Sequence, residues 1–290
     1  MKRSIPSMLI IGLLAVLLAS CGQSTTGQQT SGTPTASSHT HLSRIAWQGF
    51  LDADQTTAAI FSANTDGSDV RQLTQPNTGD EEANPAWSPD GSKIIFTLNS
   101  ANAPGDLFLM NADRKGLKQL AHCTQPCLGM GVAAWSPDGS TIAYSEGDGP
   151  PRSNGDPSVA VLWLMHSDGS HRVQLTHPLL PTSFADDGPA WSPDGTRILF
   201  QSFGAFPPGS TPQLYTIFPD GTHLVQLTSK ECNSWPAWSP DGTKIIFAHR
   251  STTGVDQNAH LYEMNADGSS LVQVTRNDFW QLQPTWGTAP

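Results

Sequence analysis

Four copies of one hexapeptide set the organisation of this chain. The first copy is Ala86-Trp87-Ser88-Pro89-Asp90-Gly91, and the others occupy 134–139, 190–195 and 237–242. A fifth, incomplete copy, Thr285-Trp286-Gly287, lies near the end of the sequence. The tryptophans of the five copies are 48, 56, 47 and 48 residues apart. Regular spacing in this range is typical of propellers and solenoids.

Short β-strand patterns fill each repeat. Around Trp135 they predict four strands, at 131–136, 141–145, 161–165 and 172–176. The second strand recurs at 44–47, 93–97, 197–201 and 244–248, where β-branched and aromatic residues lie between turn residues. No segment between the strands has convincing helical periodicity. The sequence therefore predicts an all-β protein.

The repeated aspartates are best explained by turns. In Ser-Pro-Asp-Gly, proline presets φ, aspartate hydrogen-bonds nearby amides, and glycine accepts a positive φ. A second turn uses Asp-Gly at 66–67, 168–169, 220–221 and 267–268, whereas Asp113-Arg114 departs from it. Because a chemical site needs one set of groups rather than five, we interpret these aspartates as turn residues and not as catalytic acids.

The first repeat, about 42–74, lacks a tryptophan strand of its own, and 283–287 supplies one from the other end of the chain. Pairing of the two ends would remove the exposed sheet edges. The prediction is a single β-propeller over 42–288, with five four-stranded blades closed by the C-terminal strand pairing with the N-terminal blade.

The first residues have the features of an export signal. Lys2 and Arg3 precede an apolar run, 8–18, and Leu18-Ala19-Ser20-Cys21 resembles the bacterial lipobox, which implies lipid attachment at Cys21. We expect 1–20 to be a lipoprotein signal peptide. Residues 21–41, rich in Ser, Thr, Gly and Gln, would form a flexible tether. An ordinary signal peptide with a chance cysteine is the alternative.

Charge and cysteine content limit the function further. A formal net charge of −10 without a basic stripe argues against nucleic-acid binding. Export permits disulfides, and Cys123 and Cys127 could close a small loop, with Cys232 left over. Free thiols are the alternative there, and a metal site using His122 matches no zinc spacing.

The repeat resembles the TolB-like, WD-related β-propeller family. The clearest example is His260-Leu-Tyr-Glu-Met-Asn-Ala-Asp-Gly268, and the pattern recurs over about 42–288. The resemblance implies a protein-binding propeller in the cell envelope. The TolB protein that names the family has six blades and an α/β domain before them, where this chain has its tether. Other relatives gate a peptidase, but no Gly-x-Ser-x-Gly elbow occurs here.

Residues outside the repeat pattern are the candidates for function, because binding groups on propellers lie mainly in loops. Acidic residues at the channel mouth could hold Ca²⁺, and the alternative is that they are solvated loop charges. These acidic candidates are Asp80, Glu81, Glu82, Asp186 and Asp187. Extra aromatic residues could anchor a partner or be buried between blades. They are Trp235, Phe279 and Trp280.

The expected function is that of a membrane-anchored, extracytoplasmic binding or scaffolding module, at the cell surface or in the periplasm. Its partner would be an envelope protein or an extracellular ligand, and we expect a monomer. The alternative is a carbohydrate-active or other hydrolytic enzyme that uses acidic residues at the propeller mouth.

Overall fold

The computed structural model describes residues 44–100, 103–124, 127–148, 159–177, 184–203, 211–252, 258–276 and 281–284. All of them belong to one compact unit, Leu42–Pro290, and the chain's other unit is Met1–His41. The described residues form 19 strands and no helix, which confirms the all-β prediction. Accordingly, they include no helix long and apolar enough to cross a membrane. The predicted signal peptide and tether lie outside the described residues.

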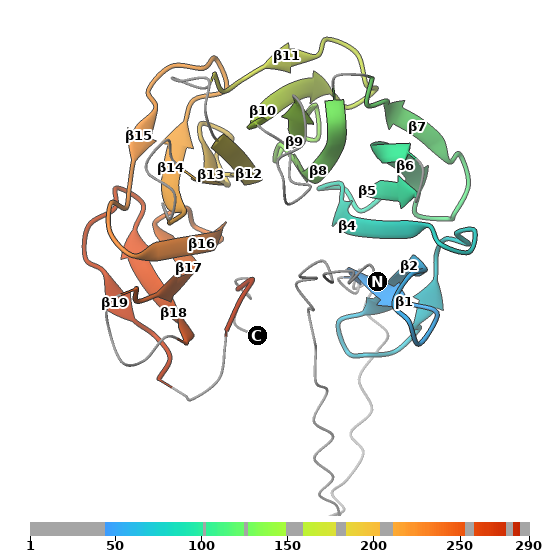
Figure 1. Cartoon of the computed structure of the whole chain (residues 1–290), viewed down its shortest axis with the longest axis horizontal. Helices are drawn as coiled ribbons and strands as arrows, with labels where there is room; N and C mark the ends of the chain where they lie inside the picture. The colour runs from blue at the N-terminus through green and yellow to red at the C-terminus, as the bar shows by residue number, and fades with distance from the viewer. Residues whose placement is uncertain are drawn as a thin grey trace, which may run out of the picture. The chain divides into compact units, whose positions relative to one another are not determined.

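The strands follow one another as five groups, here called repeats 1 to 5, which Figure 1 colours from blue to red. Repeat 1 has three described strands and each later repeat has four. They are β1 (Arg44–Phe50), β2 (Ala58–Asn64) and β3 (Arg71–Gln72); β4 (Glu81–Trp87), β5 (Lys93–Ser100), β6 (Ala103–Asn111) and β7 (Lys118–Ala121); β8 (Cys127–Trp135), β9 (Thr141–Asp148), β10 (Val159–His166) and β11 (Val173–Gln174); β12 (Phe184–Trp191), β13 (Ile198–Ser202), β14 (Gln213–Ile217) and β15 (Val225–Gln226); β16 (Cys232–Trp238), β17 (Lys244–Arg250), β18 (Ala259–Asn265) and β19 (Val272–Gln273).

Within each repeat the strands pair antiparallel in chain order. Short parallel pairings, Ala58 with Glu81 and Ala160 with Ala185, join repeat 1 to repeat 2 and repeat 3 to repeat 4. The first strands of neighbouring repeats also lie in contact: β4 with β8, β8 with β12, and β12 with β16. Consecutive repeats are therefore stacked through their tryptophan strands.

The core lies between repeats rather than within them. Four clusters of buried side chains each combine residues of two consecutive repeats, as in Leu162 with Phe200 and Leu214 with Phe247. Each cluster also contains or contacts one tryptophan of the hexapeptide. The indole nitrogen of Trp135 donates a hydrogen bond to the Ala86 carbonyl oxygen of the preceding repeat, at 3.2 Å. A single repeat would expose one of its faces, so the stacking of repeats is what buries the core.

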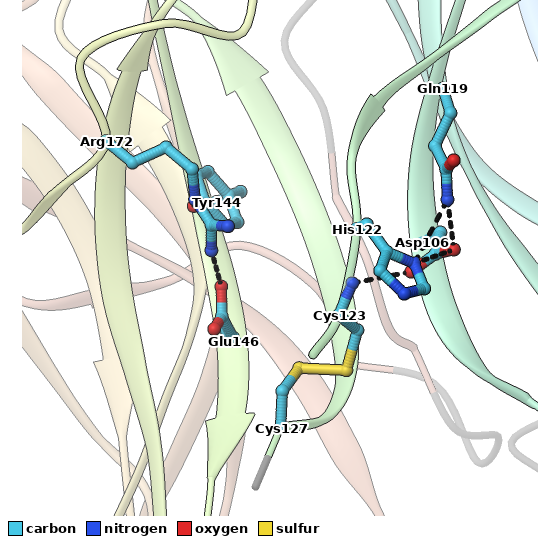
Figure 2. The surroundings of a disulfide bond; sticks show 8 residues. All are labelled: Asp106, Gln119, His122, Cys123, Cys127, Tyr144, Glu146 and Arg172. Atoms are coloured by element: carbon cyan, nitrogen blue, oxygen red, sulfur yellow. Dashed lines mark hydrogen bonds and ion pairs between the residues drawn. A yellow bond between two sulfur atoms is a disulfide. The ribbon is translucent and has the colours of Figure 1, made fainter. Parts of the chain in front are cut away.

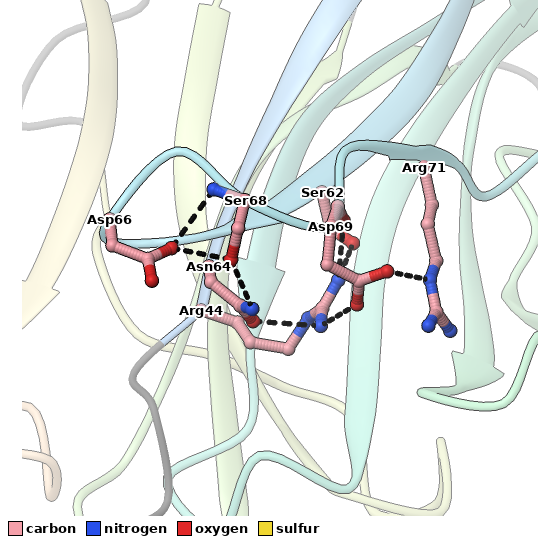
Figure 3. Close-up of polar contacts among 7 residues, drawn as sticks. All are labelled: Arg44, Ser62, Asn64, Asp66, Ser68, Asp69 and Arg71. Atoms are coloured by element: carbon pink, nitrogen blue, oxygen red, sulfur yellow. Dashed lines mark hydrogen bonds and ion pairs between the residues drawn. The ribbon is translucent and has the colours of Figure 1, made fainter.

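The Ser-Pro-Asp-Gly runs form the tight turns that the sequence predicts. Asp90 accepts hydrogen bonds from the Ser88 hydroxyl at 2.6 Å and from the Ser92 amide at 3.0 Å. These bonds hold the pKa of Asp90 down at about 2. The second turn of repeat 1 has the same chemistry (Figure 3): Asp66 accepts from the amide and the hydroxyl of Ser68. These aspartates are ionised turn residues, as predicted.

Repeat 1 contains a further polar staple, also drawn in Figure 3. Arg44 at the start of β1 donates to Ser62 on β2 and to Asp69, and Asp69 also accepts from Arg71. The staple ties β1, the first described strand of this repeat, to β3. Of the segment expected to close this repeat, 283–287, residues 285–287 with the tryptophan lie outside the described residues, so closure and the count of five blades remain predictions.

Candidate functional site

The acidic candidates lie at the beginnings of first strands. Glu81 and Glu82 open β4, with Asp80 directly before them, and Asp186 and Asp187 lie in β12. The expectation that these residues occupy loops was therefore wrong for all but Asp80. The first strand starts well before its tryptophan, and paired backbone takes up the segment that we had assigned to loops.

Glu82 and Asp186 occupy the same position of the repeat, five residues before the tryptophan. Glu82 accepts a hydrogen bond from the Thr74 hydroxyl, and that hydroxyl accepts the Ile60 amide at 2.9 Å. In the same way Thr176 bonds to Asp186 and accepts the Leu162 amide at 2.9 Å. Each threonine lies two residues after the last strand of the preceding repeat, β3 or β11. We call each such pair, Thr74–Glu82 and Thr176–Asp186, a hydroxyl latch.

Related latches at later junctions use amides instead of carboxylates. In the fifth repeat Thr275 accepts the Leu261 amide and donates to Oε1 of Gln281. Thr228 donates to Gln213, which in turn accepts from the Asn233 side chain. Because Gln281 accepts from Thr275 as Glu82 accepts from Thr74, the latch does not require a charged acceptor. Glu82 and Asp186 thus have a role in the framework.

Burial raises the pKa of both latch acids. Desolvation is the main cause for Glu82 and for Asp186, and it outweighs the hydrogen bonds that each accepts. The neighbouring carboxylates Asp80 and Asp187 raise the two pKa values further. A carboxyl group whose pKa is raised on folding stabilises the protein below its unfolded pKa, and that contribution is lost as the pH rises through the folded pKa.

Replacing Glu82 by glutamine should therefore stabilise the protein at high pH. Glutamine can accept from Thr74 as Gln281 does from Thr275, without the cost of a buried charge. We expect the Tm of Glu82→Gln to exceed the wild-type value by about 3 °C at pH 8 and to match it at pH 4. Scanning calorimetry at both pH values measures this difference. An equal difference at the two values would mean that folding leaves the pKa of Glu82 unchanged.

The other three acids also have internal partners. Asp80 accepts from the Ser100 hydroxyl at 2.6 Å and from the side-chain Nδ2 of Asn77 at 2.9 Å, and these bonds lower its pKa. Glu81 accepts from Gln48 at 2.7 Å, and Asp187 accepts from Ser145 at 2.7 Å. The last two bonds cross from one repeat to the next. Among the described residues, no three His, Cys, Asp or Glu side chains gather in a group that could hold a metal ion.

The junction of repeats 2 and 3 is built differently. Ala121 stands where the other repeats have the latch threonine, and Met130 stands where they have the acceptor. A disulfide between Cys123 and Cys127 lies at this junction (Figure 2), and both cysteines are buried with Met130 and Ala121 in one cluster. The disulfide and apolar packing thus take the place of the polar latch.

Asp106 supports the same junction from β6. Its carboxylate accepts the Cys123 amide at 2.7 Å and contacts His122 Nδ1 at 2.9 Å, and the side chain of Gln119 donates to it as well. Figure 2 shows these groups converging beside the disulfide. Within repeat 3, Arg172 donates to the Tyr144 hydroxyl at 2.8 Å, and burial raises the pKa of that tyrosine to about 12. These polar groups belong to the framework of the junction.

Removal of the disulfide should lower stability by about 2 kcal/mol, the loop entropy that a cross-link of this short span removes from the unfolded chain. The test is the Tm of a Cys123→Ser/Cys127→Ser variant, with and without dithiothreitol. Dithiothreitol should lower the Tm of the wild type and of the control Cys232→Ser, and should leave the double variant unchanged. Equal sensitivity of all three proteins would contradict the prediction.

Trp235 lies in β16 and has an unusual backbone conformation. Its φ is 54°, its amide donates to Gln201 of the preceding repeat at 2.9 Å, and its side chain is half-buried. The strand pairing shifts register at this point, and the same position holds Asn84, Gly188 and Gln283, also at positive φ, in other repeats. The bulge is thus a feature of the repeat, and the tryptophan at it is particular to repeat 5. Phe279 and Trp280 lie outside the described residues.

Four-stranded antiparallel repeats that stack through their first strands and share their cores define a β-propeller. Within that class, the chain belongs to the TolB beta propeller domain family, whose model matches residues 23–289.

Named relatives agree with this assignment. The chain is 28% identical over 147 residues to a Protein TolB homolog of Chlorobium luteolum, covering 49% of this chain and 28% of the relative. It is 32% identical over 92 residues to the Tol-Pal system protein TolB of Anaeromyxobacter dehalogenans, covering 32% of this chain and 18% of that protein. These matches thus span less than a third of the curated relatives. TolB from Acinetobacter baumannii has the same fold, with a TM-score of 0.61 and 20% identity over 80% of this chain and 52% of that one.

Proposed function

We propose that the protein is an extracytoplasmic, lipid-anchored propeller that binds another protein of the cell envelope. The observation that carries this proposal is that the candidate acidic residues bind groups of the protein itself. Hydrogen bonds across junctions between repeats hold four of them in the framework: Glu81, Glu82, Asp186 and Asp187. A hydrolase of the glycosidase type needs two carboxyl groups facing one substrate bond, and these acids have framework partners instead.

The remaining support comes from the sequence and from the relatives. The first residues have the pattern of an export signal with a lipidation site, formed by Lys2, Arg3, the apolar run 8–18 and Cys21. One relative is named as a protein of the Tol-Pal system, which makes a protein partner the natural choice for this propeller as well. The negative net charge of −10 favours partners that present basic groups.

Crosslinking in intact cells tests the proposal. The full chain, expressed with its own first 20 residues, should yield a discrete crosslinked envelope protein, identified by mass spectrometry. A Cys21→Ser variant should leave the membrane fraction and still bind that partner once both are purified. Absence of any specific crosslink would contradict the binding function, and so would release of sugar from a polysaccharide panel by the wild type but not by Asp187→Asn.

A further inference from the structure

A groove runs between repeats 1 and 2. Its volume is about 530 Å³, within the range of sites that take small ligands or the side chains of a bound peptide. One wall is the end of repeat 1 and the other is repeat 2. The lining residues are Gln72, Leu73, Thr74, Gln75, Glu82, Met110, Asp113, Arg114 and Leu117.

The inner part of the groove combines apolar side chains with one carboxyl group. Leu73 and Met110 are buried, and Glu82, which also lines the groove, is only 6% exposed. Thr74 occupies one oxygen of Glu82 through the hydroxyl latch. A ligand that reaches this depth gains most if it brings a hydrogen-bond donor with positive charge, because bonds between charged groups are the strong ones in a partly dry site.

The outer part of the groove carries an arginine in a backbone conformation that favours glycine. Arg114 has φ of 68°, and the corresponding residue in the other four turns is Gly67, Gly169, Gly221 or Gly268. A residue with a side chain at such a positive φ lowers the folding stability by about 1 kcal/mol compared with glycine. The guanidinium of Arg114 has no hydrogen-bond or ion-pair partner among the described residues. It is thus placed to receive an anionic group.

The wall formed by repeat 1 ends in an edge strand. β3 pairs with β2 through Phe61–Gln72 and Ser62–Arg71, and with no other described strand. An edge strand offers backbone donors and acceptors to an added strand, which is a common way of binding extended peptides. The groove therefore combines an open strand edge with the guanidinium of Arg114 and with two carboxyl groups, those of Glu82 and Asp113.

We propose that this groove binds an extended peptide segment of a partner protein, with a basic side chain directed to Glu82 and an acidic side chain directed to Arg114. The segment lies along β3, and its apolar groups contact Leu73, Met110 and the exposed Leu117. The inference rests on the proposed protein-binding function and names the place and the chemistry of the contact. The basic side chain of the peptide takes the inner position and the acidic side chain the outer one, because Glu82 lies deep in the groove and Arg114 lies at the surface.

The chain itself supplies test variants that should fold. Arg114→Gly installs the residue found in the other four turns, and Glu82→Gln installs the residue that Gln281 provides at the same position of the repeat. Lys115→Ala is the matched control, because it removes one positive charge beside Arg114 without changing the groove lining. Tm values at or above that of the wild type would show that the first two variants keep the fold.

A displayed heptapeptide library is the probe. Selection on the wild-type protein, with counter-selection on the Arg114→Gly/Glu82→Gln double variant, should enrich peptides that carry both a Lys or Arg and an Asp or Glu. Fluorescence anisotropy with the enriched peptides should give at least tenfold higher Kd for each single variant and an unchanged Kd for Lys115→Ala. No enrichment, or equal Kd for wild type and double variant, would overturn the groove assignment.

The crosslinked partner separates this inference from the proposed function. If the double variant still binds that protein with wild-type affinity, the partner uses another surface and the groove inference fails while the binding function stands. If binding falls at least tenfold with both single variants, the same groove serves the natural partner.

Discussion

Replacement of Thr176 by valine should destabilise the protein by about 3 kcal/mol, because one hydroxyl satisfies two buried groups. Thr176 accepts the Leu162 amide and donates to Asp186, which is 8% exposed. Valine keeps the shape of threonine and removes both bonds, so a buried N–H and a buried carboxyl group each lose a partner. Urea unfolding followed by far-UV circular dichroism measures the loss. A cost under about 0.5 kcal/mol would mean that water replaces the hydroxyl.

The junction of repeats 2 and 3 suggests how to rescue that loss. There the latch pair is replaced by Ala121 and Met130, both buried. A Thr176→Ala/Asp186→Met double variant copies that pair, and it should be less destabilised than the sum of its two single variants, since no carboxyl group remains to be desolvated. The rescue is partial because the Leu162 amide still lacks its acceptor. Strict additivity would show that the two positions are uncoupled.

The sequence predicts the strands and turns of this fold well because their chemistry is local. Pro89, Asp90 and Gly91 specify a turn within four residues, and the β-branched strand 93–97 follows directly. The latch depends on a contact between two repeats, which the sequence does not display. From the sequence alone, Glu82 and Asp186 are therefore interpreted as acidic residues of loops. A signal was nevertheless present: aligned on the tryptophans, the fifth preceding residue is polar in every copy except the one with Met130.

The groove could not be predicted from the sequence either, and for the same reason. Its walls come from 72–75 and 110–117. These segments are far apart in the sequence, so no single stretch of residues predicts the groove. Arg114 was visible as the departure from an Asp-Gly turn, but only the structure shows that this turn lies at the groove. In a repeat protein the departures from the pattern indicate where to look, and the packing of repeats decides what each departure does.

Substitution of Gly169 by alanine should cost about 3 kcal/mol or more, because it forces two repeats apart. Gly169 has φ of 92°, and a Cβ atom there would lie 2.6 Å from the carbonyl oxygen of Leu120 in the preceding repeat. Backbone cannot turn aside as a flexible side chain can, so β7 itself must move. The affected junction is the one that contains the disulfide and lacks the polar latch.

Gly67 provides the matched control, since it occupies the corresponding turn of repeat 1. Its φ is 80°, and a Cβ atom there would meet nothing within 4 Å. Gly67→Ala should therefore show only the cost of the positive φ, about 1 kcal/mol. Urea unfolding of both variants isolates the contact between repeats as their difference, about 2 kcal/mol in this estimate. Equal losses would mean that repeats 2 and 3 separate without penalty at this turn, and that their shared core alone holds them together.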